Sequence, residues 1–186
     1  MNILLRTGFL AVLLISLSCK VTKEDNSDNK SISVFRVASG DIGSWKEKSD
    51  GGYSGIVSDL GQFLNGGKEI YEKQCIVQGF NQRLAIGSDE KIMSSTVLEY
   101  PSASNASATL TELGNQNYLS DKQSISGYAD TIAVIGKNTL SGCKAFAHFG
   151  VYFFVLEATG YANRSDAIDA IGDFLSHFKS KASDVN

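Results

Sequence analysis

Residues 143–159, which read CKAFAHFGVYFFVLEAT, decide the fold. They divide at Phe149 and Gly150 into two runs rich in apolar and aromatic residues, a composition that favours strands. We therefore predict strands over 143–149 and 151–159, joined by a tight turn or bulge. The second run is apolar on both faces, with Tyr152, Phe154 and Leu156 on one and Phe153 and Val155 on the other. Such a strand is typical of the centre of a sheet that is covered on both sides.

The segment that follows predicts a helix from Asn163 to Lys181. Asn163 or Ser165 is the expected N-cap, and the acidic residues lie near the start and the lysines near the end, as the helix dipole favours. The apolar stripe of this helix consists of Ile168, Ile171, Phe174, Leu175 and Phe178.

An antiparallel hairpin is predicted earlier in the chain. The segments 76–86 and 92–100 alternate between apolar and polar residues, and the turn-forming residues 87–90 join them. In the first strand, one face carries Ile76, Phe80, Leu84 and Ile86, and the other carries Asn81 and Arg83. Pro101 ends the second strand.

Several shorter elements complete the expected order. We predict a first strand at 32–37, a helix from Ser58 through Tyr71, a short helix capped by Ser102 or Ser104 and stopped by Gly114, a loop at 115–126 and a strand at 128–135. Runs of adjacent strands pair mostly antiparallel. The sequence therefore predicts a single α+β domain over 32–182, with about five to six mostly antiparallel strands and about three helices.

The first 18 residues have the anatomy of a secretory signal. Arg6 is followed by an apolar run and then by small residues before Cys19. The residues ISLSC at 15–19 resemble a bacterial lipobox, in which the cysteine receives lipid and becomes the first mature residue, although Ser16 stands where leucine is usual. An ordinary cleaved signal without lipid is the alternative. The run is too short for a membrane span, which needs about 20 apolar residues.

This resemblance implies a lipoprotein signal peptide at 1–18 and a palmitate-type lipid anchor at Cys19. Residues 19–31 are polar apart from Val21 once the cysteine is set aside, so we expect a flexible tether. The domain would then sit in the bacterial cell envelope, on the periplasmic face or the cell surface, with the membrane as one partner.

Charge and cysteine content limit the function classes. The net charge is −3 and no cluster of Lys and Arg occurs, which argues against nucleic acid as a partner. Besides Cys19 the chain has Cys75 and Cys143. Outside the cytoplasm these two either form a disulfide or remain small buried hydrophobes.

No catalytic constellation is evident. The segment Gly52-Tyr53-Ser54-Gly55 comes close to a nucleophile elbow, but Ile56 stands where the last glycine belongs. The two histidines, His148 and His177, lack nearby ligands at zinc spacing, so neither a metal nor another cofactor is expected. We expect a non-enzymatic domain that binds a protein or a small molecule. The alternative is a serine-dependent envelope hydrolase in which Ser54 works with a distant histidine.

The best candidate site is the segment 65–69. Asn65, Gly66 and Gly67 interrupt an otherwise apolar helix, next to Glu69 and Tyr71. Either Asn65 bonds a neighbouring element while the glycines make room, or a small ligand contacts the exposed backbone. Trp45, the single tryptophan, lies in a glycine-rich loop and is either a core plug or a ligand platform.

These residues also carry a resemblance. Gly43-Ser44-Trp45-Lys46, the run Phe63-Leu64-Asn65-Gly66-Gly67 with Glu69 and Tyr71, and Gly79-Phe80 resemble an uncharacterised family of bacterial secreted domains. Glu99-Tyr100 with Ala106, and Phe146 through Gly150 with Tyr152, extend the likeness over about residues 40–180. The family has no assigned activity, so the resemblance implies a fold and a location but no chemistry.

Overall fold

The computed structural model describes residues 32–48, 55–56, 68–88, 90–116, 121–135 and 142–185. In chain order its elements are η1 (Ile32–Phe35, a 3₁₀ helix), β1 (Lys46–Glu47), β2 (Gly55–Ile56), α1 (Lys68–Glu72), β3 (Gln78–Ile86), β4 (Lys91–Glu99), α2 (Ala103–Gly114), β5 (Gln123–Ile125), β6 (Tyr128–Ile135), β7 (Cys143–Phe149), β8 (Tyr152–Thr159) and α3 (Arg164–Val185).

All the strands belong to one sheet in the order β1-β3-β4-β8-β7-β6-β5, and β2 also pairs with β3. Every pairing is antiparallel. Together with the three α-helices among the described residues, this sheet confirms the predicted α+β fold. The described sheet has eight strands rather than the predicted five or six. The pattern of the sequence did not predict β1, β2 and β5, because these strands are only two or three residues long.

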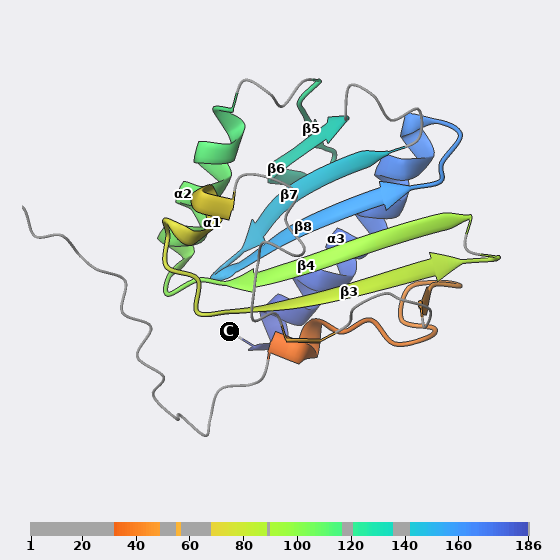
Figure 1. The fold of residues 1–186 in the computed structure, drawn as a ribbon, viewed down its shortest axis with the longest axis horizontal. Coiled ribbons are helices and arrows are strands. Elements are labelled where there is room, and N and C mark those ends of the chain that lie inside the picture. The colour runs from red at the N-terminus through yellow and green to blue at the C-terminus, as the bar shows by residue number, and fades with distance from the viewer. Residues whose placement is uncertain are drawn as a thin grey trace, which may run out of the picture.

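Helices cover both faces of the sheet. Figure 1 shows α3 running behind the strands, while α1 and α2 lie side by side at one end. One cluster of buried residues, the α3-side core, joins η1 and α3 to the sheet and includes Trp45, Phe154 and Phe174. A second cluster, the α2-side core, joins α1 and α2 to the sheet and includes Tyr71 and Phe153.

The two strands predicted from 143–159 lie at the centre of the molecule. β8 lies between β4 and β7. Its residues Phe154 and Leu156 belong to the α3-side core, whereas Phe153 and Val155 belong to the α2-side core. The predicted central strand, covered on both faces, is therefore confirmed. The turn before β8 holds Gly150 at a φ of +59°, which favours glycine.

Two of the predicted elements are wrong. The first strand predicted at 32–37 is the 3₁₀ helix η1, because Ile32 and Phe35, three residues apart, are both buried on one side of it. The loop predicted at 115–126 contains strand β5, which buries Ile125 against the α3-side core.

The helix ends follow the predicted caps. The Ser102 hydroxyl accepts the N–H of Asn105 at the start of α2, at 3.2 Å. The Asn163 side chain accepts the N–H of Asp166 at the start of α3, at 2.9 Å. α3 continues beyond the predicted end to Val185. Of the helix predicted from Ser58, residues 68–72 form α1 and residues 58–67 lie outside the described part.

The predicted signal peptide and tether, residues 1–31, also lie outside the described residues. Among the helices that the structure describes, none combines the length and the apolar character of a membrane span.

Candidate functional site

The sheet separates the residues that the sequence suggested as one site. Trp45 is 4% exposed and lies edge-on to Phe174 in the α3-side core, with ring centroids 5.3 Å apart. Tyr71 is 3% exposed and packs in the α2-side core, where its carbonyl accepts the hydroxyl of Tyr100 at 3.2 Å. Trp45 is therefore a core plug, and it does not meet Tyr71.

The other residues of that predicted site are exposed or lie outside the described part of the chain. Glu69 is exposed on the first turn of α1. Asn65, Gly66 and Gly67 lie outside the described residues, as does Ser54 of the elbow-like segment.

The two histidines lie on opposite sides of the sheet. His148 in β7 pairs with Phe153, which belongs to the α2-side core, whereas His177 belongs to α3. In a serine–histidine–carboxylate triad the histidine Nδ1–H is held by the carboxylate. Among the described residues, the buried Nδ1 of His148 has no hydrogen-bond partner, and neither has the buried Nε2 of His177. The same part of the chain contains no group of three or more His, Cys, Asp or Glu that could hold a metal ion.

The cysteines differ in state. Cys143 is a free, buried thiol, and burial raises its pKa although Arg164 opposes the shift. The Cys75–Cys143 disulfide is therefore absent, and Cys143 is the small buried hydrophobe of the other alternative. Cys75 is disulfide-bonded, and the one further cysteine of the sequence is Cys19, which lies outside the described residues.

The structure reveals a row of polar side chains that crosses four strands, β3, β4, β8 and β7, and reaches the residue after β1. In an antiparallel sheet, residues that pair directly across strands share a face. Arg83 pairs with Ser94, Ser94 with Glu157, and Glu157 with Lys144. The N–H of Lys48 donates to the carbonyl of Arg83 at 2.9 Å, which extends the row to Lys48, the residue after β1. We call these five residues the polar row: Lys48, Arg83, Ser94, Glu157 and Lys144.

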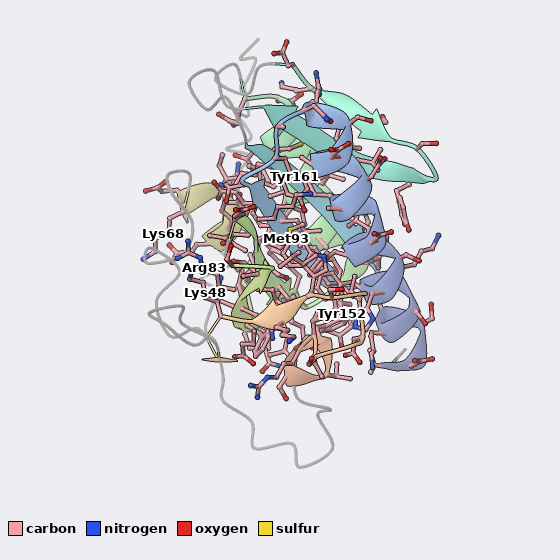
Figure 2. All side chains as sticks on the ribbon, turned by 90° about the vertical axis from the view of Figure 1, so that its right-hand side faces the viewer. Lys48, Lys68, Arg83, Met93, Tyr152 and Tyr161 are labelled. Carbon is pink, nitrogen blue, oxygen red and sulfur yellow. The ribbon has the colours of Figure 1, made fainter. Side chains whose placement is uncertain are left out.

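The polar row lies on the side of the sheet that faces away from α3. The neighbouring row links Asn81, Thr96 and Val155, and Val155 belongs to the α2-side core. Figure 2 shows Lys48 and Arg83 on this side, with α3 on the other. The α2 helix packs against the apolar end of this face. The polar row lies on the same face of the sheet, beyond that apolar end.

The polar row holds three cationic side chains and one anionic side chain. Lys144 and Glu157 form an ion pair at 3.7 Å with both side chains partly exposed. The Nε of Arg83 is buried and has no hydrogen-bond partner among the described residues. An unsatisfied buried donor costs about 1–3 kcal/mol. In the next row, Asn81 donates to the hydroxyl of Thr96 at 2.8 Å, so these two polar groups satisfy each other.

Part of this row is visible in the alternation of the sequence. Alternation along 76–86 predicted Asn81 and Arg83 on the face opposite Phe80 and Leu84, and the structure confirms that separation, with Phe80 and Leu84 in the α3-side core. Ile76 is an exception, because it precedes β3 and packs against the α2-side core. Lys48, Lys144 and Glu157 were missed, since only the pairing of distant strands aligns them with Arg83.

The polar row presents hydrogen-bond donors and charged groups on one face of the sheet. A guanidinium group presents donors in a planar fork that matches carboxylate and phosphate oxygens. Within the polar row, the hydroxyl of Ser94 has no histidine beside it to act as a base, because its cross-strand neighbours are Arg83 and Glu157.

Comparison with known proteins gives a structural likeness. No family model matches the chain, and no curated protein matches it. A similar solved structure is the extracellular domain of PknH from Mycobacterium tuberculosis, with a TM-score of 0.54 and 14% sequence identity. The match covers 82% of this chain and 94% of that one. At this identity the likeness shows a shared fold.

Proposed function

We propose that this chain is a bacterial envelope lipoprotein, anchored at Cys19, whose folded domain binds a partner or small molecule without catalysing a reaction. The observation that carries the proposal is the signal-like segment ending in ISLSC at 15–19, followed by a polar stretch up to Ile32, which is buried in the described domain. One acyl chain gives marginal membrane binding, whereas two or more give stable anchoring.

The described part of the domain supports a binding role. His148 and His177 lie on opposite sides of the sheet, and each has a buried ring nitrogen for which the described residues provide no hydrogen-bond partner, which disfavours the serine-hydrolase alternative. The polar row offers a face on which a ligand can be held. The fold shared with an extracellular domain supports a location outside the cytoplasm.

The state of the Cys19 sulfur decides the proposal. A thioether to lipid and a disulfide use the same sulfur atom and exclude each other, so the proposal requires a Cys19 sulfur that carries lipid.

Metabolic labelling with radioactive palmitate tests this directly. The full chain is expressed in a bacterium that processes lipoproteins, together with Cys19→Ala and, as the matched control, Cys75→Ala. We expect label in the wild type and in Cys75→Ala, and none in Cys19→Ala, which should also leave the membrane fraction. Label that persists in Cys19→Ala, or a wild type that never takes label, would overturn the anchor.

A further inference from the structure

We infer that the polar row contains an oxyanion-binding site centred on Arg83, which takes the phosphate or carboxylate group of a small soluble ligand. The inference rests on the binding role proposed above and deepens it, because it names the place and the chemistry of recognition. It does not depend on the lipid at Cys19.

The first argument is the unsatisfied donor. The Nε of Arg83 is buried, and none of the described residues offers it an acceptor. Buried polar groups in folded proteins almost always have a hydrogen-bond partner. The arginine side chain is also charged at every pH that proteins tolerate, so it cannot relieve the burial by losing its proton. Arg83 is only half-buried as a whole, so its side chain has hydrogen-bonding capacity that the described residues do not use.

Second, Arg83 has a cationic residue on one side and a hydroxyl-bearing residue on the other. Lys48, which directly follows β1, is its neighbour on one side, and Ser94 on β4 is its neighbour on the other. The one acidic side chain in the row, Glu157, lies two strands away and pairs with Lys144. With strands about 4.8 Å apart, the backbone of Glu157 is roughly 10 Å from that of Arg83. Within the polar row, the direct neighbours of Arg83 are therefore a lysine and a serine, and neither is acidic.

The third argument concerns the type of ligand. A guanidinium fork binds phosphate and carboxylate oxygens in the same way, and a serine hydroxyl can add a further hydrogen bond. A membrane surface recruits proteins through clusters of four to eight or so basic residues. This chain carries a net charge of −3 and has an acidic side chain within the row itself, which favours a soluble anion over a lipid surface.

The test uses ¹⁵N-labelled full chain and follows the Nε–H signals of its arginines by NMR during titration. The probes are sodium phosphate and sodium acetate at constant ionic strength and, separately, vesicles of phosphatidylglycerol. We expect the Arg83 signal to shift and saturate with phosphate or acetate. The signal of Arg36, whose Nε already donates to Glu47 at 3.1 Å, is the internal control and should stay in place.

Two variants sharpen the result. Arg83→Gln should abolish the saturable response, whereas Arg36→Gln should retain it. Lys48→Gln should weaken binding several-fold, because it removes a neighbouring charge and leaves the guanidinium in place. If Arg83→Gln fails to fold, the Arg83 signal of the wild type still decides the question.

The inference is overturned if the Arg83 signal does not move, if it moves in parallel with that of Arg36, or if it responds to the vesicles alone. These results would leave palmitate labelling at Cys19 untouched. Loss of labelling with a saturable Arg83 shift would instead overturn the anchor and keep the site.

Discussion

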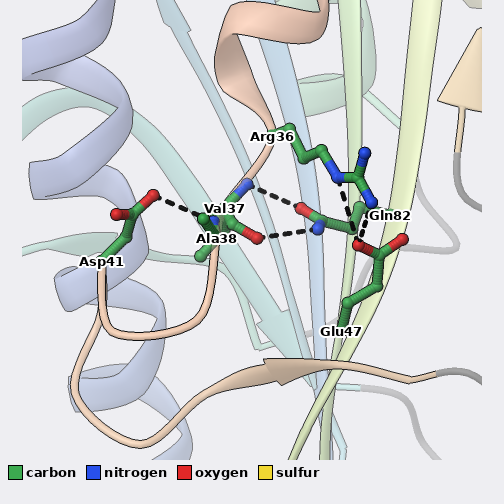
Figure 3. Close-up of polar contacts among 6 residues, drawn as sticks. All are labelled: Arg36, Val37, Ala38, Asp41, Glu47 and Gln82. Atoms are coloured by element: carbon green, nitrogen blue, oxygen red, sulfur yellow. Dashed lines mark hydrogen bonds and ion pairs between the residues drawn. The ribbon is translucent and has the colours of Figure 1, made fainter.

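The side-chain amide of Gln82 makes two hydrogen bonds to the backbone of Val37. Its oxygen accepts the N–H of Val37 and its nitrogen donates to the carbonyl of Val37, both at 2.9 Å, and Gln82 is 1% exposed. Figure 3 shows this clamp beside the ion pair of Arg36 with Glu47 and the bond from the N–H of Ala38 to Asp41. A side chain of β3 thereby satisfies the backbone that follows η1, where the sequence had predicted a strand.

Replacing Gln82 by alanine should destabilise the domain substantially. The change leaves the buried N–H and carbonyl of Val37 without partners, at about 1–3 kcal/mol each, so we expect a loss of about 2–4 kcal/mol in the free energy of unfolding. Urea denaturation followed by circular dichroism measures it. The control is Gln78→Ala on the same strand, which loses only a partly buried bond to Glu99 and should cost about 1 kcal/mol or less. Equal losses in the two variants would contradict the clamp.

Two glycines should respond to alanine in opposite directions. Gly160 has a φ of +83°, and a Cβ there would lie 1.7 Å from the carbonyl oxygen of Glu90. Gly160→Ala should therefore cost about 3 kcal/mol or more in unfolding free energy. Gly172 is in α3 with open space around its Cβ position, so Gly172→Ala should stabilise by up to about 1 kcal/mol. Thermal unfolding of both variants decides this, and a tolerated Gly160→Ala would refute the close approach to Glu90.

The thiol of Cys143 should be inert in the folded protein. It is buried, and burial raises its pKa, so little reactive thiolate is present at neutral pH. We expect a maleimide reagent to leave the Cys143 peptide unmodified in native protein and to modify it fully in urea, as read by peptide mass spectrometry. A Ser176→Cys variant, placed at an exposed position of α3, supplies the reactive control. Rapid native labelling of Cys143 would show that β7 opens to solvent.

The pH dependence of stability should show a contribution from His177. Burial lowers its pKa from the ordinary value of 6.5, with Lys181 acting in the same direction and Asp41 against it. The unfolded chain therefore binds this proton more tightly, so the contribution is complete above pH 6.5 and is lost as the pH falls through the lowered pKa of the folded state.

We accordingly expect the melting temperature to fall between pH 7.5 and pH 5 by more in the wild type than in His177→Leu. Ser176→Ala, an exposed neighbour on α3, should keep the wild-type slope. An identical slope in His177→Leu would show that this histidine does not titrate on unfolding.

The local pattern of apolar and polar residues was sufficient to predict the long strands. The strand predicted at 128–135 is β6 and that at 143–149 is β7, because alternation and flanking glycines act within a few residues. The 3₁₀ helix η1 was missed because its buried pair, Ile32 and Phe35, resembles part of a strand in so short a run.

The candidate site was harder to predict from the sequence because it depends on the pairing of strands that are distant in the chain. β4 pairs with β3, its neighbour in the chain, and also with β8, which is distant from it in the chain. That pairing brings Glu157 into line with Arg83 and puts Trp45 and Tyr71 in different cores. No periodicity along a single segment contains this information, since register between distant strands is set by the packing of the whole sheet.

The central claim is best tested by mass spectrometry of the mature protein isolated from membranes without reduction. We predict an N-terminal peptide that begins at Cys19 and carries a diacylglyceryl group on its sulfur. A mature chain that begins at Met1, or a Cys19 peptide linked by a disulfide to the Cys75 peptide, would contradict the proposed anchor.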